Sequence, residues 1–202
     1  MVFDDSAART TAIPTPSEGM VTYLKDTDAL EQFDGSNFVG VTNPAIGSNV
    51  VQTVKTNVFS MASATFTAVT GLSATITPTT ATSKVLIIAQ LAMSPQTVAD
   101  ASAYARITGG NTSGYIGDAA SNRTRAAAWV GRNFTNYIVG FGSLTSTLVF
   151  VDSPNTTSAT TYGVEMRHGS TGTVYLNRSG QDDDNANNGR LVSSITVMEV
   201  AG

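Results

Sequence analysis

The most concentrated chemistry in the sequence is a short acidic loop. Three consecutive aspartates, Asp182, Asp183 and Asp184, stand in a run of Gln, Asn and Gly residues that spans 180–189. Carboxylate and amide oxygens are the ligands that Ca²⁺ prefers, so these aspartates are a candidate calcium site. Their spacing differs from an EF-hand, because Ala186 takes the fifth position and no Glu closes the loop. A solvated hairpin loop explains the same residues, and we expect no bound cofactor.

Catalytic side chains are scarce. His168 is the one histidine, and no nucleophile elbow of the Gly-x-Ser-x-Gly type occurs, so a serine hydrolase has little support. The position of His168 beside Arg167, at the end of a predicted strand, is typical of a surface or turn residue. Glycoside hydrolysis needs two facing carboxylates, but Glu165 and Glu199 each stand in an alternating strand pattern that predicts exposure to solvent. We therefore expect no enzymatic activity.

A second cluster combines cationic and aromatic side chains. Arg123, Arg125 and Arg132 flank Trp129 within one short stretch. Such a group can bind a sugar or a phosphate. Arginine and aromatic residues are also favoured in the cores of protein interfaces. The cluster therefore indicates either a ligand site or a contact between subunits, and the sequence leaves both open.

The composition narrows the class of protein. The chain has 202 residues, enough for one well-packed domain with a small appended module, and charged residues make up only 13% of it. It contains no cysteine, which excludes disulfides and thiol catalysis. No apolar run approaches the ~20 residues of a transmembrane helix, and residues 1–11 lack the basic start and apolar core of a signal peptide. We expect no membrane partner.

Charge is divided unequally along the chain. Residues 1–45 carry seven acidic side chains against Arg9 and Lys25, a net charge of −5, whereas the remainder carries nine basic and eight acidic side chains, a net charge of +1. Nucleic-acid binding requires a clustered basic face, so we expect no nucleic-acid partner. The division predicts two regions with different neighbours, or else a first segment that is simply well solvated.

Turn residues predict a small N-terminal module of extended and hairpin segments over 1–45. The segment 13–16 favours extended backbone, because proline disfavours helix in the residue before it. Strands are expected at 20–24 and 30–33, and a tight turn at Asp34-Gly35 leads into a third at 37–41. A capped helical turn at 28–31 is the alternative. The apolar side chains expected to make docking contacts are Ile13, Val21, Tyr23, Leu30, Phe33 and Phe38.

The remainder, 46–202, is predicted to be one all-β body that follows a linker at 43–49. The expected strands are 50–58, 65–69, 73–77, 84–91, 103–108, 126–130, 135–141, 146–152, 160–167, 173–177 and 191–200. The segment 84–91 is a continuous apolar run, which is typical of a buried strand. Many short strands separated by turn residues predict an antiparallel β-sandwich or jelly roll rather than a parallel sheet.

The N-terminal segment resembles a module near the front of many bacteriophage fibre and appendage proteins. The shared pattern is an Ala-Arg start, an Ile-Pro-x-Pro-x-x-Gly-Met turn, an Asp-x-x-x-Leu step and an aromatic-Asp-Gly-x-x-aromatic hairpin. Here it is matched by Ala8-Arg9, 13–20, 26–30 and 33–38. Both aromatic positions of the hairpin are Phe, where the family usually has Tyr and Trp. The resemblance implies that this module docks the protein onto another virion component.

The body resembles a β-domain of structural proteins from tailed bacteriophages and marine viruses. The matching stretches are 66–78, 83–87, 152–162, 172–178 and 193–199. The resemblance implies a compact jelly roll, similar in outline to the tumour-necrosis-factor fold, that assembles as a homotrimer. It also implies a virion protein whose partners are copies of itself and the major capsid protein or tail components. We interpret it as a capsid decoration or head fibre; the alternative is a tail-fibre or tail-tip protein that binds a host surface receptor.

Overall fold

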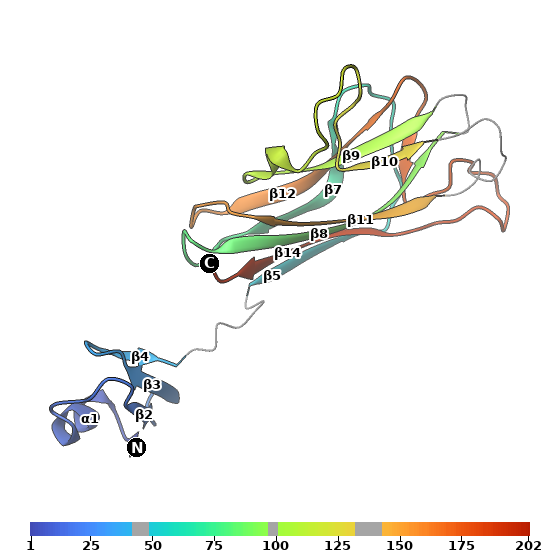
Figure 1. Cartoon of the computed structure of the whole chain (residues 1–202). Helices are drawn as coiled ribbons and strands as arrows, with labels where there is room; N and C mark the ends of the chain where they lie inside the picture. The colour runs from blue at the N-terminus through green and yellow to red at the C-terminus, as the bar shows by residue number, and fades with distance from the viewer. Residues whose placement is uncertain (42–48, 97–100, 132–142) are drawn as a thin grey trace. The chain divides into compact units, whose positions relative to one another are not determined.

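The computed structural model of the chain describes residues 1–41, 49–96, 101–131 and 143–202. The chain divides into two compact units, Met1–Ala45 and Ile46–Gly202, which are shown in Figure 1. Apart from one short α-helix and one 3₁₀ turn (η1, Thr112–Gly114), the regular structure of the described residues consists of β-strands. Every hydrogen-bonded sheet lies wholly within one unit or the other.

The N-terminal unit contains a four-stranded sheet. Its strands β1 (Val2–Phe3), β2 (Val21–Leu24), β3 (Ala29–Phe33) and β4 (Phe38–Gly40) lie side by side in that order. β1 runs parallel to β2, and the other neighbours are antiparallel. The three strands predicted in this segment are thus β2, β3 and β4. The alternative of a helical turn at 28–31 is wrong, because Ala29 pairs with Leu24 in the sheet.

Helix α1 (Ser6–Ala12) was not foreseen from the sequence. Its N-cap residue is Asp5, whose side chain accepts a 2.7 Å hydrogen bond from the backbone N–H of Ala8. Such an N-cap satisfies one of the amide donors that the start of a helix leaves free. A helix of seven residues is too short to show a periodic apolar pattern. Among the described residues, no helix is long and apolar enough to cross a membrane.

The body is built from ten strands of the described residues. They are β5 (Val50–Lys55), β6 (Phe59–Met61), β7 (Thr67–Ile76), β8 (Lys84–Pro95), β9 (Ser102–Thr108), β10 (Ala128–Gly131), β11 (Leu144–Asp152), β12 (Thr160–His168), β13 (Val174–Leu176) and β14 (Ser193–Val200). The strand that the sequence predicts at 135–141 lies outside the described residues.

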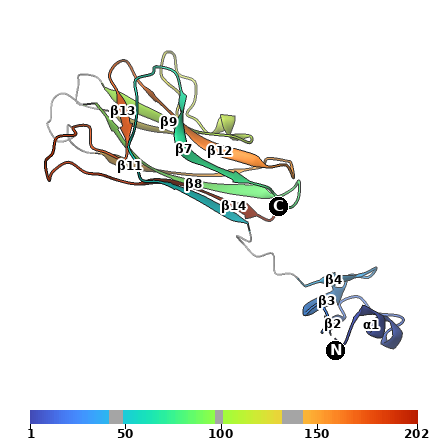
Figure 2. The same cartoon turned by 180° about the vertical axis from the view of Figure 1, so that it is seen from behind.

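These strands form two packed antiparallel sheets, which confirms the predicted β-sandwich. One sheet has the order β10-β9-β12-β7; the other has the order β5-β14-β8-β13-β6, with β11 also paired to β8. Figures 1 and 2 show the two layers from opposite sides. The chain passes repeatedly from one sheet to the other between β6 and β13, as in a jelly roll.

Strand β8 is the centre of its sheet. One of its edges pairs with β14 along 84–90, and the other pairs with β11 along 85–93. Ile87 points into the sandwich and is fully buried, whereas Leu86 and Ile88 point to the other side and are only half-buried. The apolar run predicted to be buried is therefore fully covered on one face only.

The hydrophobic core lies between the two sheets. Strands β9 and β14 are buried at every second residue, as expected for strands with one covered face. The largest fully buried side chains come from both sheets and are Tyr162, Leu72, Ile76, Ile87, Leu91, Met93, Met166, Leu176 and Ile195. Since each large apolar side chain contributes about 1.5–3 kcal/mol when buried, this layer is the main source of the body's stability.

A buried asparagine anchors the long loop between β13 and β14. Asn177 is fully buried, with a φ of +66°. Its amide group donates to the backbone carbonyls of Lys55 (2.7 Å) and Asn57 (3.1 Å), and its carbonyl accepts from the hydroxyl of Ser193 at 2.6 Å. The Ser193 hydroxyl in turn accepts from the backbone N–H of Ala92 at 3.0 Å. Asn177 therefore joins the two ends of the loop to the neighbouring strands.

We predict that Asn177→Ala destabilises the protein. The change removes the donor to the Lys55 and Asn57 carbonyls and the acceptor of the Ser193 O–H, and a buried group that loses a partner costs about 1–3 kcal/mol. We expect the free energy of unfolding to fall by about 3 kcal/mol, measured by urea denaturation at fixed protein concentration. Asn187→Ala, an exposed change in the same loop, should alter it by less than about 0.5 kcal/mol. Equal effects of the two variants would contradict the role of Asn177.

Candidate functional site

The sheet of the N-terminal unit has one apolar face that the other described residues of this unit leave uncovered. Side chains of directly paired residues point to the same side of a sheet, and Tyr23 pairs with Leu30 while Gln32 pairs with Val39. We call this surface the module face; its apolar members are Val2, Val21, Tyr23, Leu30, Val39 and Val41. All of them except Tyr23 are between 43% and 60% exposed.

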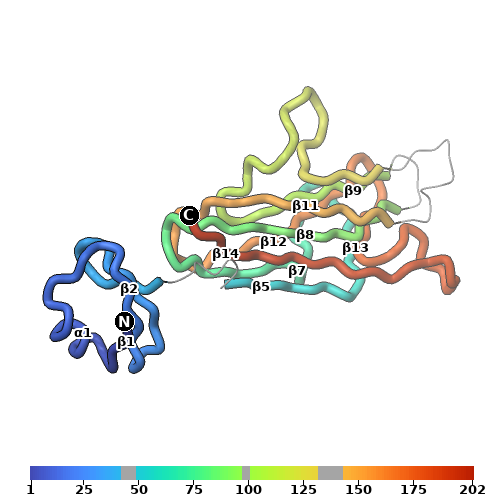
Figure 3. Tube along the Cα trace, turned by 60° about the horizontal axis from the view of Figure 1, so that its bottom comes forward, coloured from blue at the N-terminus to red at the C-terminus, as the bar shows by residue number. Residues whose placement is uncertain are grey.

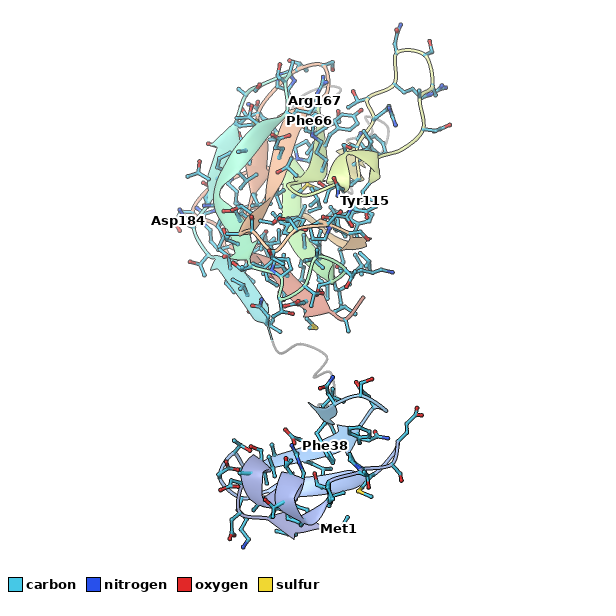
Figure 4. All side chains as sticks on the ribbon, turned by 90° about the vertical axis from the view of Figure 1, so that its left-hand side faces the viewer. Met1, Phe38, Phe66, Tyr115, Arg167 and Asp184 are labelled. Atoms are coloured by element: carbon cyan, nitrogen blue, oxygen red, sulfur yellow. The ribbon has the colours of Figure 1, made fainter. Side chains whose placement is uncertain are left out.

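The opposite face of the same sheet is covered by α1. Arg9 on this helix is buried, forms an ion pair with Glu31 and lies with its guanidinium 3.8 Å from the centre of the Phe38 ring. Phe33 packs against Phe38, with ring centres 5.1 Å apart. Phe38 is labelled in Figure 4. This internal contact fixes the helix to one side of the sheet and leaves the module face outward.

The six predicted docking residues are divided between these two faces. Three of them belong to the module face: Val21, Tyr23 and Leu30. Phe33 and Phe38 instead pack inside the unit, and Ile13 is half-buried at the end of α1. Val39 and Val41 also belong to this face and were not predicted, although their alternate spacing is the strand pattern that indicates a shared face.

The body carries a second uncovered apolar surface, on the outer face of the sheet that contains β5, β14, β8 and β11. Figure 3 shows these four strands side by side. We call this surface the body band; it consists of the cross-strand row Val50, Met198, Leu86 and Val151, with Ile88 and Val149 in the next row. Val149 is 56% exposed and Val151 48%. Successive apolar residues such as those at 149–151 indicate a strand that is apolar on both faces.

The outer face of the other sheet exposes aromatic and cationic side chains. Trp129 on β10 is 59% exposed, and its ring centre lies 6.5 Å from that of Tyr104, its partner on β9. Arg106 is two residues beyond Tyr104 on β9, so it points to the same face. It forms a 2.7 Å ion pair with Glu165, its partner on β12, and its guanidinium lies 4.3 Å from the centre of the Phe66 ring. Phe66 is labelled in Figure 4. This surface combines the residue types that most often dominate binding energy.

The arginine cluster predicted around Trp129 is only partly placed by the structure. Arg132 lies outside the described residues. Arg125 donates to the backbone carbonyl of Gly117 at 2.6 Å, and Arg123 is exposed. The aromatic neighbour of Trp129 is Tyr104, which the sequence could not reveal because it comes from a different strand.

The acidic loop is held by arginines. Asp182 forms ion pairs with Arg178 at 3.1 Å and with Arg190, and the hydrogen bond from Arg190 is the main reason that the pKa of this carboxyl is lowered. Asp183 accepts a hydrogen bond from Gln181. Across the residues that the structure describes, no group of three or more His, Cys, Asp or Glu side chains is placed to hold a metal ion. The geometry thus gives no support to a calcium site at Asp182, Asp183 and Asp184.

A buried carboxylate positions the loop that follows β9. Asp152 is fully buried and accepts hydrogen bonds from the hydroxyl of Tyr162 at 2.6 Å and from the backbone N–H of Asn111 at 3.1 Å. Burial, together with the hydrogen bond to Asp152, raises the pKa of Tyr162 well above its usual value. Gly110 permits the approach, because a Cβ at this residue would lie 2.0 Å from the carboxylate. Asp152 therefore has a structural role that the sequence analysis did not identify.

The two strand carboxylates, Glu165 and Glu199, belong to different sheets of the body, and each has partners of its own. Glu165 forms an ion pair with Arg106. The predicted exposure of Glu199 is wrong, because this residue is only 6% exposed. The backbone N–H and the hydroxyl of Thr79 donate to Glu199 at 2.7 and 2.6 Å, and Asn49 donates at 3.3 Å. Burial by itself raises the pKa of Glu199, but hydrogen bonds from Ser83, Thr79 and Asn49 outweigh it and lower the pKa to about 2.

Comparisons with known proteins do not assign the chain to a family. No family model matches it, and no curated protein matches it. Among solved structures, that of infectious bursal disease virus strain Gt is 12% identical, with a TM-score of 0.37 over 85% of this chain and 44% of that one. The VP2 subviral particle of this virus is 13% identical, with a TM-score of 0.34 over 93% and 46%. The chain spans less than half the length of these viral chains, and a likeness of this degree does not extend to function.

We predict that Glu199→Gln weakens the fold at neutral pH and flattens its response to acid. The folded-state pKa of about 2 lies below the ordinary value of 4.5. Ionised Glu199 therefore stabilises the fold above that ordinary value, and the stabilisation is lost as the pH falls from about 5 to about 2. Urea denaturation at successive pH values measures the effect. Glu18→Gln, an exposed change, is the control; a profile for Glu199→Gln parallel to that of the wild type would contradict the prediction.

Proposed function

We propose that the protein is a virion structural protein, a homotrimeric surface appendage that decorates or is attached to a capsid. The observation that carries the proposal is the pair of uncovered apolar sheet faces, one on each unit. Contiguous exposed apolar surface marks sites of protein association. The resemblance of both sequence segments to phage structural proteins supports the same role. The body forms the appendage, and the N-terminal unit attaches it to another virion protein such as the major capsid protein.

The body band suits contact between copies of this chain. None of the six side chains of the band is charged, so like-charge repulsion between identical bands comes only from Lys84, which borders Leu86 on the same face of β8. The band crosses the sheet from Val50 on β5 to Val149 and Val151 on β11, and these valines are its most exposed members. In a closed ring of three, each copy offers two different patches to its two neighbours. Exposed apolar residues at both ends of the band supply such patches.

The second candidate is a receptor-binding protein of a tail fibre or tail tip. The observation that favours it is the exposed Trp129 beside Tyr104, on a face that also carries Arg106. Tryptophan, tyrosine and arginine are enriched among the residues that contribute most to binding. The partner under this alternative is a component of the host surface. Neither candidate includes catalysis.

Adsorption to host cells distinguishes the two candidates. Under the leading proposal, fluorescently labelled protein shows no saturable binding to host cells. Saturable binding that is lost in Trp129→Ala, but kept in Leu144→Ala, would instead favour the tail protein. Leu144 is a suitable control because it is similarly exposed, at 53%, and lies on the other sheet.

The mass of the protein in solution tests the proposed trimer. We predict a species with three times the 20.9 kDa mass of the chain in native mass spectrometry. Val151→Glu places a charge within the body band, which should shift the protein to monomers because an unpaired charge is costly to bury. Val192→Glu changes a valine that is similarly exposed, at 50%, and lies outside the band, so it should leave the trimer intact. A monomeric wild type, or a trimer indifferent to Val151→Glu, would contradict the role of the band.

A further inference from the structure

We propose that the module face binds an apolar protein surface bordered by lysine or arginine side chains, one of which enters an acidic hollow beside the β3–β4 turn. This inference rests on the proposed virion function and specifies the chemistry of the partner to which the N-terminal unit attaches. It follows from three features of this unit: an uncovered apolar sheet face, a hollow lined by two carboxylates, and the use of the unit's own cations in internal ion pairs.

The apolar centre of the surface is set by the pairing of the strands. Every position of the module face is apolar except Gln32. The face cannot serve as the unit's own core, because α1 packs on the opposite side through the contact of Arg9 with Glu31 and Phe38. Val39, at 45%, and Leu30, at 46%, are exposed on neighbouring strands. A partner that covers them removes apolar surface from water, which favours association.

The hollow lies at the hairpin end of this face. It has a volume of about 500 Å³ and is lined by Glu18, Gly19, Gln32, Phe33, Asp34 and Val39. Backbone N–H groups of Asn37 (2.7 Å) and Ser36 (2.8 Å) donate to the Asp34 carboxylate and lower its pKa, so it stays charged at neutral pH. A lining that combines Phe33 and Val39 with two carboxylates matches a lysine or arginine, whose stem is apolar and whose head is charged.

The charges of the unit select against a second copy of the same face. Its two basic side chains are already used, Arg9 with Glu31 and Lys25 with Asp4 at 2.8 Å. Among residues 1–41, the acids that form no ion pair include Glu18, Asp26, Asp28 and Asp34. Two such faces would bring like charges together, whereas a partner with a basic rim gains electrostatic complementarity. The six side chains of the body band carry no charge, so they do not select against a second copy of the band in this way.

Binding of the full-length protein to capsid shells tests the inference. The probe is a purified shell assembled from the major capsid protein encoded with this chain. Dissociation constants are measured at low and at physiological salt. The wild type is expected to bind, and its affinity should fall as salt rises, because salt screens charge pairs at the rim of an interface.

Two kinds of variant separate the apolar from the charged contribution. Val39→Asp, and independently Val41→Asp, place a charge on the module face and should weaken binding at least about tenfold. Glu18→Gln should weaken binding about threefold at low salt and reduce its salt dependence. The matched changes on the body, Val192→Asp and Asp184→Asn, should leave the dissociation constant within about twofold of the wild type. Native mass and circular dichroism are recorded for every variant.

The remaining outcomes contradict either the inference alone or the attachment to the capsid as well. Wild-type binding that neither module-face variant nor Glu18→Gln weakens would overturn the inference and leave the proposed function standing. Failure of the wild type to bind shells would overturn the attachment to the capsid, and the inference with it. Loss of the trimer in Val39→Asp would identify the module face as a contact between copies of this chain, which would also overturn the inference.

Discussion

Successive side chains of a β-strand point to opposite faces of its sheet, so a sheet that is apolar on both faces needs two covering layers. Each unit of this protein supplies only one covering layer for its apolar sheet. In the body, the second sheet covers Ile87 and its neighbours, while Leu86 and Ile88 on the same strand stay half-buried. In the N-terminal unit, α1 covers one face and leaves Val39 on the other. Among the described residues, each unit therefore keeps one apolar sheet face without a covering layer.

Buried polar side chains hold the chain where it leaves the regular sheets. Asn177 closes the long loop before β14, Asp152 fixes the loop after β9, and Glu199 binds the segment around Thr79. Each of these groups is supplied with hydrogen-bond partners, as a buried polar group must be. These three side chains are therefore committed to holding loops and strand ends in place.

Alternation and turn residues were sufficient to predict the β-sandwich and the strands β2, β3 and β4. The order of strands in each sheet was not predictable, because the pairing of β8 with both β14 and β11 joins segments far apart in the sequence. Glu199 shows the limit most clearly. It was predicted to face solvent although its spacing from Ile195 and Val197 is that of the inner face, because its partners Thr79 and Asn49 lie 120 and 150 residues away. The neighbour of Trp129 was not predictable either, because Tyr104 comes from another strand.

A count of copies in purified virus particles would decide whether these uncovered faces build a capsid appendage. Quantitative mass spectrometry gives the ratio of this chain to the major capsid protein. A trimeric decoration of a symmetric shell should be present in on the order of hundreds of copies, in a number divisible by three. About a dozen copies would be the number expected of a tail component rather than of a shell decoration. That result would contradict the capsid role, as would absence from the particle.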